Sequence, residues 1–88
     1  MFIVRWARSA RDELAALWIQ AESERRQEIT AAAHRIDQEL ETNPDGVGES
    51  RLGNERVAFF FPLGIRFDVD QEQSTVRVLQ VWNYRQRR

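Results

Sequence analysis

The end of the chain places aromatic rings beside guanidinium groups. The run Trp82-Asn83-Tyr84-Arg85 follows an apolar stretch directly, and Tyr84 is the single tyrosine of the sequence. An aromatic side chain can stack on a nucleobase, and a neighbouring Arg can bind a phosphate through paired N–H donors. These residues are therefore candidates for a nucleic-acid site. The alternative is that Trp82 is buried in the core and that Tyr84 and Arg85 only end the strand.

The basic residues are of one type, since all 13 are Arg and Lys is absent. This excludes a phosphate-binding loop that depends on Lys, a Schiff-base enzyme and a lysine general base. A GC-rich genome is the simplest explanation of the Arg bias. The guanidinium group nevertheless suits phosphate well.

Metal and cofactor sites are not expected. Cysteine is absent, and the single histidine, His34, lies within a helical stretch, where we expect it to be partly exposed. One His without Cys does not make a zinc site. The segment Gly48-Glu49-Ser50-Arg51-Leu52 lacks the second Gly of a nucleophile elbow, and Gly46-Val47-Gly48 lacks the third Gly of a dinucleotide fingerprint.

Charge divides the chain into two parts. The net charge is −1 and the pI about 5.8. Residues 1–48 carry six Arg and nine acidic residues, whereas residues 49–88 carry seven Arg and five acidic residues. The basic second part indicates either a basic working surface or a solvated tail. No apolar run approaches the length of a membrane span and no signal peptide is recognisable, so we expect a cytoplasmic protein with no membrane partner.

Hydrophobic periodicity predicts the order of the elements. Apolar residues recur at helical spacing through residues 10–41, with a short connection near residues 21–24. Ser9 and Ser23 are the expected N-caps. We expect strands at 2–6, 55–61, 65–70 and 75–83, a loop or short edge strand at 47–52, and turns at 62–64 and 71–74.

These elements predict one α+β domain over residues 1–88. The order is β-α-α-β-β-β, with an antiparallel sheet and the N-terminal helical hairpin packed on one of its faces. Trp6 and Trp18 are core candidates. The other face of the sheet is expected to carry Arg66, Asp68 and Asp70, together with Arg56 or Arg77.

Several segments resemble the RelE/ParE superfamily of bacterial toxins from toxin–antitoxin pairs. They are Val4-x-Trp6-x-x-x-Ala10-x-x-Glu13-Leu14, Gly48-Glu49-Ser50-Arg51, Leu63-Gly64-Ile65-Arg66-Phe67-Asp68-Val69 and Val78-Leu79-Gln80-Val81-Trp82-Asn83-Tyr84-Arg85. The resemblance implies a small toxin that a cognate antitoxin protein holds inactive. RelE-like members cleave messenger RNA at the ribosome, whereas ParE-like members poison DNA gyrase without cleaving nucleic acid. A non-toxic interaction module of the same fold is the third alternative.

For RelE-like cleavage, the resemblance implies Arg66, Tyr84 and Arg85 as catalytic residues. Cleavage by attack of a 2′-hydroxyl needs a base, an acid and positive charge near the developing phosphorane. An Arg supplies the charge but not the base, because its pKa lies above about 12. Tyr84 is then the best-placed acid or base, with Glu49 or Asp68 as the next candidates.

Contacts to the RNA are expected from four further residues, which are Arg51, Arg56, Trp82 and Asn83. Asn83 stands where many ribonuclease members have His, and an amide cannot transfer a proton. The acidic pI is a second departure from members that act on the ribosome. Both departures favour the gyrase poison or an inactive member as the alternative.

Overall fold

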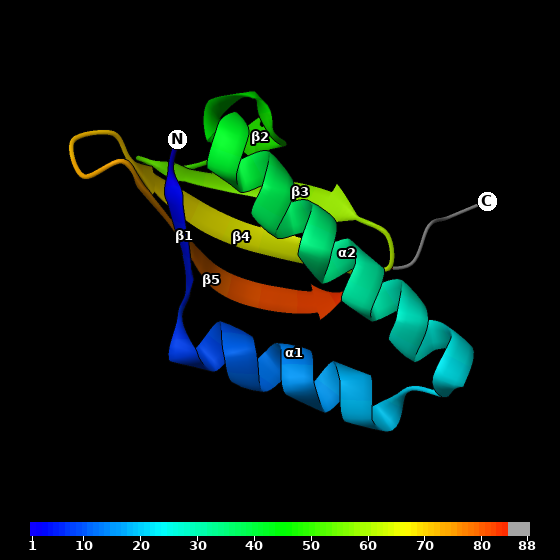
Figure 1. The fold of residues 1–88 in the computed structure, drawn as a ribbon. Coiled ribbons are helices and arrows are strands. Elements are labelled where there is room, and N and C mark those ends of the chain that lie inside the picture. The colour runs from blue at the N-terminus through cyan, green and yellow to red at the C-terminus, as the bar shows by residue number, and fades with distance from the viewer. Residues whose placement is uncertain (85–88) are drawn as a thin grey trace.

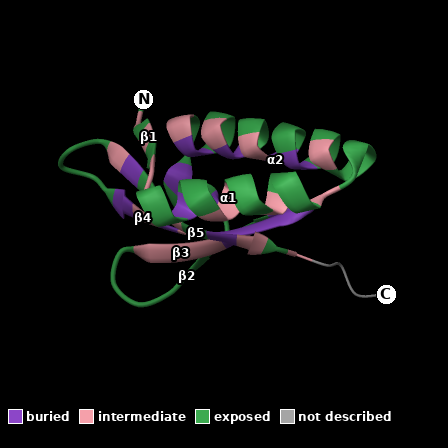
Figure 2. Ribbon diagram, turned by 90° about the horizontal axis from the view of Figure 1, so that it is seen from below, coloured by how far each residue is buried: buried purple, intermediate pink, exposed green. Residues whose placement is uncertain are grey.

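A five-stranded sheet carries two helices on one face in the computed structural model, which describes residues 1–84 (Figure 1). The strands are β1 (Ile3–Trp6), β2 (Glu49–Ser50), β3 (Glu55–Phe60), β4 (Leu63–Asp70) and β5 (Thr75–Asn83). The helices are α1 (Arg8–Gln20) and α2 (Ser23–Thr42), followed by a short 3₁₀ turn at Pro44–Gly46. Figure 2 shows both helices on the same side of the sheet.

The predicted α+β class and element order are confirmed, and the sheet is mixed rather than wholly antiparallel. Its strand order is β1-β5-β4-β3-β2, and β1 pairs with β5 in parallel. The helical hairpin carries the chain from β1 across the sheet to its far edge. The meander β3-β4-β5 then returns, so that β5 arrives beside β1 in the same direction.

The core lies between the helices and the near face of the sheet. Its buried apolar residues are Ala10, Ile29, Ala32, Ile36, Leu40, Val47, Ala58, Phe60, Leu63, Ile65, Phe67, Val69, Val76, Val78 and Val81. Trp6 is half-buried against this core, and its Nε1 donates to Asp37 Oδ1 at 2.8 Å. The prediction that Trp18 belongs to the core is wrong, because 41% of it is exposed.

The helix starts differ from the prediction. Ala7 and Glu22 occupy the N-cap positions of α1 and α2, without side-chain caps. Ser9 lies inside α1, and its Oγ donates to the carbonyl of Leu79 at 3.3 Å. At the other end of α1, the Arg26 guanidinium donates to the Trp18 and Ile19 carbonyls, at 2.8 and 2.9 Å, and satisfies acceptors that a helix leaves free.

Helix α1 covers the part of β5 that extends beyond β1. A β-bulge leaves Leu79 without a partner in β4, since Val78 pairs with Phe67 and Gln80 with Arg66. Glu13 Oε1 accepts the backbone N–H of Val81 at 2.8 Å, while Ser9 satisfies the Leu79 carbonyl. Side chains of α1 therefore supply the hydrogen-bond partners that a longer β1 would give to this part of β5.

The hairpin between β3 and β4 is tighter than predicted. It turns through Phe61 and Pro62, and Leu63 and Gly64 already belong to β4 rather than to the turn. Burial explains the difference, because both Leu63 and Gly64 pack inside the structure. The short β2 confirms the alternative of an edge strand within residues 47–52.

Candidate functional site on the uncovered sheet face

The strand register determines which side chains face away from the helices. We call this surface the open face. It carries Glu55, Val57 and Phe59 of β3, Gly64, Arg66, Asp68 and Asp70 of β4, and Arg77, Gln80 and Trp82 of β5, with Arg5 of β1 and Glu49 of β2 at its two edges. Residues of β4 alternate, so that Ile65, Phe67 and Val69 point to the core and their neighbours point outward.

One end of the open face holds three aromatic rings. The ring centroid of Phe59 lies 6.2 Å from that of Trp82, at an interplanar angle of 81°, and 4.5 Å from that of Tyr84. Gly64 lies opposite Trp82, and a Cβ at Gly64 would come within 2.5 Å of the indole. Gly64 therefore lets the indole lie directly on the backbone of β4. Phe59 is 52% exposed, so this ring remains available to a partner.

The charged residues of the open face form pairs. Arg66 Nη1 donates to Glu55 Oε1 at 2.8 Å, and Arg66 Nε donates to Gln80 Oε1 at 3.3 Å. Arg77 Nη2 donates to Asp68 Oδ2 at 3.1 Å. Glu55 lies directly opposite Asp68 in the register. Each carboxylate of this like-charged pair is therefore neutralised by its own Arg.

At the edge of this surface, too, an Arg is paired with a carboxylate. Arg51, which follows β2, donates from Nη1 to Glu49 Oε2 at 3.1 Å. The open face and its edge thus hold four Arg and four acidic residues, which are Arg5, Arg51, Arg66, Arg77, Glu49, Glu55, Asp68 and Asp70. Their formal charges cancel, so local pairing rather than a net positive field defines the surface.

The structure brings three predicted site residues together. Arg66, Trp82 and Tyr84 lie at the same end of the open face, since Arg66 is two positions along β4 from Gly64, which faces Trp82. Arg51 is exposed at its edge. The alternative that Trp82 is buried in the core does not hold, because its indole lies on the face away from the helices and is half-buried.

Two predicted RNA-binding residues point elsewhere. Arg56 faces the helix side of β3, where its Nε and Nη2 donate to the carbonyls of Val47 and Gly48 at 2.9 and 3.0 Å. It therefore anchors the segment before β2, and the open face carries Arg77 instead. Asn83 pairs with buried Leu63 and lines a small pocket beside the helix connection. The structure thus places both outside the candidate site, and Arg85 lies outside the described residues.

Three members of the open face escaped the sequence analysis as site residues. Glu55, Phe59 and Gln80 contact the predicted site residues Arg66, Trp82 and Tyr84. The alternation of residues 55–60 puts Glu55 and Phe59 on one face of the strand. An assumed register with β4 would have placed this face beside Arg66. Gln80 gave no such signal, because the bulge at Leu79 shifts the alternation of β5.

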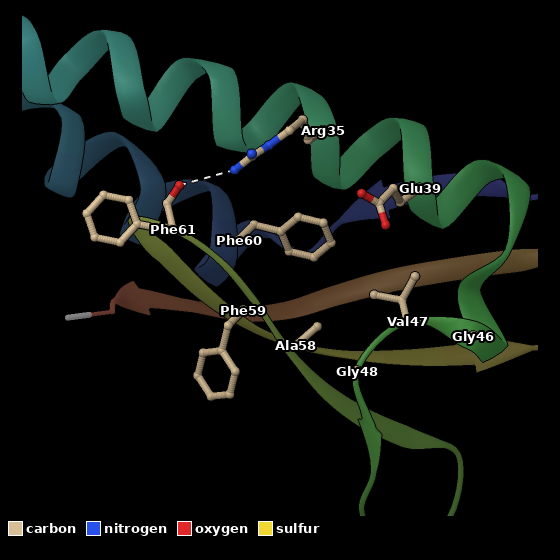
Figure 3. A pocket seen from close by; sticks show the side chains of 9 residues that line it. All are labelled: Arg35, Glu39, Gly46, Val47, Gly48, Ala58, Phe59, Phe60 and Phe61. Carbon is tan, nitrogen blue, oxygen red and sulfur yellow. Dashed lines mark hydrogen bonds between the residues drawn. The ribbon is translucent and has the colours of Figure 1, made fainter. Parts of the chain in front are cut away.

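Two further hollows lie away from the open face. A groove of about 580 Å³ between α1 and α2 is lined mainly by apolar side chains, among them Leu14, Trp18 and Ile19, and Ile19 is 66% exposed. A pocket of about 590 Å³ lies at the edge of β3 beyond β2. Figure 3 shows Arg35 above this pocket, where its Nη2 donates to the Phe61 carbonyl at 3.2 Å.

Within residues 1–84, no three His, Asp or Glu side chains come together in a way that could hold a metal ion. Neither of the two helices is long and apolar enough to cross a membrane.

Comparison with known proteins identifies the fold. No family model and no curated protein matches the sequence. The structure is similar to the RelBE2 toxin–antitoxin complex from Mycobacterium tuberculosis, with a TM-score of 0.72 and 21% identity over 93% of this chain and 90% of that chain. It is also similar to the chromosomal ParDE TA system from P. aeruginosa, with a TM-score of 0.74 and 16% identity over 97% and 98% of the two chains.

The isolated E. coli RelE toxin is a third similar structure, with a TM-score of 0.65 and 13% identity over 99% of this chain and 88% of that chain. At these identities the similarity shows the fold. The chain therefore has the fold of RelE and ParE structures, and the predicted resemblance is confirmed at that level.

Proposed function

We propose that this chain is the toxin of a toxin–antitoxin pair and that it inhibits translation by cleaving messenger RNA on the ribosome. The observation that carries the proposal is the position of Arg66, Tyr84 and the exposed ring of Phe59 at one end of the open face. A guanidinium can stabilise a developing phosphorane, a phenol can transfer a proton, and an exposed ring can stack on a base taken out of its stack.

Each of these groups has a distinct task in the proposed reaction. Phe59 stacks on a base and thereby holds the RNA strand in position. Arg66 stabilises the charge that develops on the phosphorane while the 2′-hydroxyl attacks. Glu55, whose carboxylate lies 2.8 Å from Arg66, takes the proton of the 2′-hydroxyl as that oxygen bonds to phosphorus. The bond from phosphorus to the 5′-oxygen breaks, and the Tyr84 hydroxyl gives its proton to this leaving oxygen, so that a 2′,3′-cyclic phosphate remains. The reaction needs the phosphate to displace Glu55 from at least one N–H of Arg66.

The proposed partner is a cognate antitoxin that binds the helix side of the molecule. The groove between α1 and α2 offers apolar side chains, and Trp18 and Ile19 among its lining residues are exposed. An amphipathic segment can bury its apolar face in such a groove. We place both proteins, and the ribosome as target, in the cytoplasm.

A cell-free bacterial translation assay tests the proposal. Purified wild-type protein is expected to lower reporter yield and to create new messenger 5′ ends that depend on ribosomes. Arg66→Ala and Tyr84→Phe are expected to lower the cleavage rate by roughly two orders of magnitude or more, as loss of a charge-stabilising or proton-transferring group does. Intact messenger and full reporter yield at protein concentrations above those of ribosomes would overturn the proposal.

A second candidate function is poisoning of DNA gyrase without nuclease activity. The paired charges favour it, because Arg51, Arg66 and Arg77 each already have a carboxylate partner. A protein that binds a nucleic acid usually offers unpaired positive charge. A gyrase supercoiling assay distinguishes the two candidates, since a poison would inhibit supercoiling and would retain this effect in Tyr84→Phe.

A further inference from the structure

The parallel pairing of β1 with β5 places two guanidinium groups side by side at the end of the open face remote from Tyr84. Arg5 lies opposite Arg77 in the register. The two residues line a polar pocket of about 490 Å³, together with Asn54, Asp68, Asp70 and Thr75. Like charges on adjacent strands repel one another, so this arrangement needs an explanation.

The carboxylates in this pocket are already engaged. Asp68 Oδ2 accepts from Arg77 Nη2 at 3.1 Å, and Asp70 Oδ1 accepts the backbone N–H of Gln73 at 3.1 Å. Arg5 makes no side-chain hydrogen bond or ion pair within residues 1–84. A guanidinium has five N–H donors, so Arg5 and the remaining donors of Arg77 can still bind an acceptor.

A phosphate group fits these donors. Two neighbouring guanidinium groups can hold its oxygens through several charge-assisted hydrogen bonds, and the added negative charge removes the repulsion between the two Arg. The carboxylates of Asp68 and Asp70 lower the affinity for an isolated phosphate dianion. A phosphodiester carries less charge, and it can be held here when the same strand is bound elsewhere on the open face.

The pocket and the aromatic rings of the open face lie along the same strand, β5. Arg77 and Trp82 are on the same strand, and their separation along β5 is roughly 17 Å at about 3.3 Å per residue. We propose that Arg5 and Arg77 form a second phosphate site, which binds the RNA backbone a few nucleotides from the base stacked at Phe59. This inference rests on the proposed function. It adds a site that positions the bound RNA strand across the open face.

Salt dependence of RNA binding tests this site. Fluorescence anisotropy measures the affinity of a labelled single-stranded dodecanucleotide and of a dinucleotide, at several salt concentrations, for wild type and Arg5→Gln. One lost phosphate contact is expected to lower the slope of log K against log salt by about 0.7 for a single strand. The loss is expected with the dodecanucleotide, which can reach both ends of the open face, and not with the dinucleotide.

Arg11→Gln is the matched control, because it removes the same charge from an exposed Arg on the helix side of the molecule. Arg77→Gln is the second variant and is expected to give the same loss as Arg5→Gln. Inorganic phosphate is a separate probe of the pocket. If Arg5→Gln weakens binding of inorganic phosphate but leaves binding of the dodecanucleotide unchanged, the pocket takes free phosphate and the inference that it binds the RNA backbone is wrong.

Two results separate this inference from the proposed function. If Arg5→Gln and Arg11→Gln have the same salt slope while Arg66→Ala weakens RNA binding, the second phosphate site does not exist and the proposed RNA surface stands. If wild type binds neither oligonucleotide, the proposed RNA surface itself fails, and the second site fails with it.

Discussion

The guanidinium of Arg66 on β4 reaches diagonally to the carboxylate of Glu55 on the neighbouring strand β3, with 2.8 Å between Nη1 and Oε1. The side chains are 36% and 39% exposed, so the pair lies at the surface rather than in the core. Glu55 thereby holds the candidate charge-stabilising group of the site against the sheet. It also occupies a donor that a phosphate would need.

Removal of this carboxylate is expected to strengthen RNA binding. Glu55→Gln leaves Arg66 without a competing anion, so its affinity for a single-stranded oligonucleotide is expected to rise several-fold, with a steeper salt dependence by about 0.7. The free energy of unfolding is expected to change by less than about 1 kcal/mol, as for other exposed pairs. Anisotropy titrations check this against Glu72→Gln, which removes a charge from an exposed turn. Equal affinities for the two variants would contradict the expectation.

Gly64 is expected to tolerate no side chain while Trp82 is present. Gly64→Ala places a Cβ 2.5 Å from the indole, so the ring must move or β4 must shift. The cost is expected to be about 1–3 kcal/mol in the free energy of unfolding, measured by urea denaturation. The double variant Gly64→Ala/Trp82→Leu, compared with Trp82→Leu alone, is the control, because the smaller side chain leaves room for the methyl group. If Gly64→Ala costs as much in the Trp82→Leu background as in wild type, the indole is not the cause.

The carboxylate of Glu13 is expected to stabilise β5 through the backbone. Glu13→Ala leaves the N–H of Val81 without its acceptor, and an unsatisfied backbone donor costs about 1–3 kcal/mol. Glu13→Gln retains an acceptor oxygen and is expected to recover most of the loss. Thermal and urea unfolding measure both variants beside Glu24→Ala, an exposed Glu on α2. Equal stability of Glu13→Ala and Glu24→Ala would contradict this role.

A charge in the helix groove is expected to prevent neutralisation by the antitoxin. Ile19→Glu buries a carboxylate wherever a partner covers this exposed position, and burial of an unpaired charge is unfavourable. Cells that express the variant with the cognate antitoxin are expected to stop growing, whereas wild type with antitoxin is tolerated. Ala16→Glu, exposed on α1 outside the groove lining, is the matched control. Full neutralisation of Ile19→Glu would place the antitoxin elsewhere.

Sequence patterns predicted the elements well because each has a strong local signal. The clean alternation of residues 65–70 fixed the two faces of β4, and the helical spacing of residues 10–41 fixed the hairpin. The parallel partner of β1 and the bulge at Leu79 were not predicted, since both depend on the path of the whole chain. The position of Trp18 was wrongly predicted for a comparable reason. Helical spacing identifies an apolar stripe but does not say which part of it contacts the sheet.

The candidate site was predicted in part for a similar reason. Arg66 and Tyr84 were named from residue chemistry and resemblance, and they lie at the same end of the open face. The choice between Arg56 and Arg77 for the open face stayed open, and Asn83 was assigned to neither face, because a shift of one position in a strand moves a side chain to the other face. Glu55 becomes recognisable as the partner of Arg66 only when the strands are paired.

Induced expression in bacterial cells tests most directly whether the open face is the working surface of a toxin. Wild type, Arg66→Ala/Tyr84→Phe and the helix-side variant Arg11→Gln are compared by growth rate at equal protein levels. We expect growth arrest with wild type and with Arg11→Gln, and normal growth with the open-face variant. Normal growth with wild type, or arrest by the open-face variant as strong as that by wild type, would contradict the account.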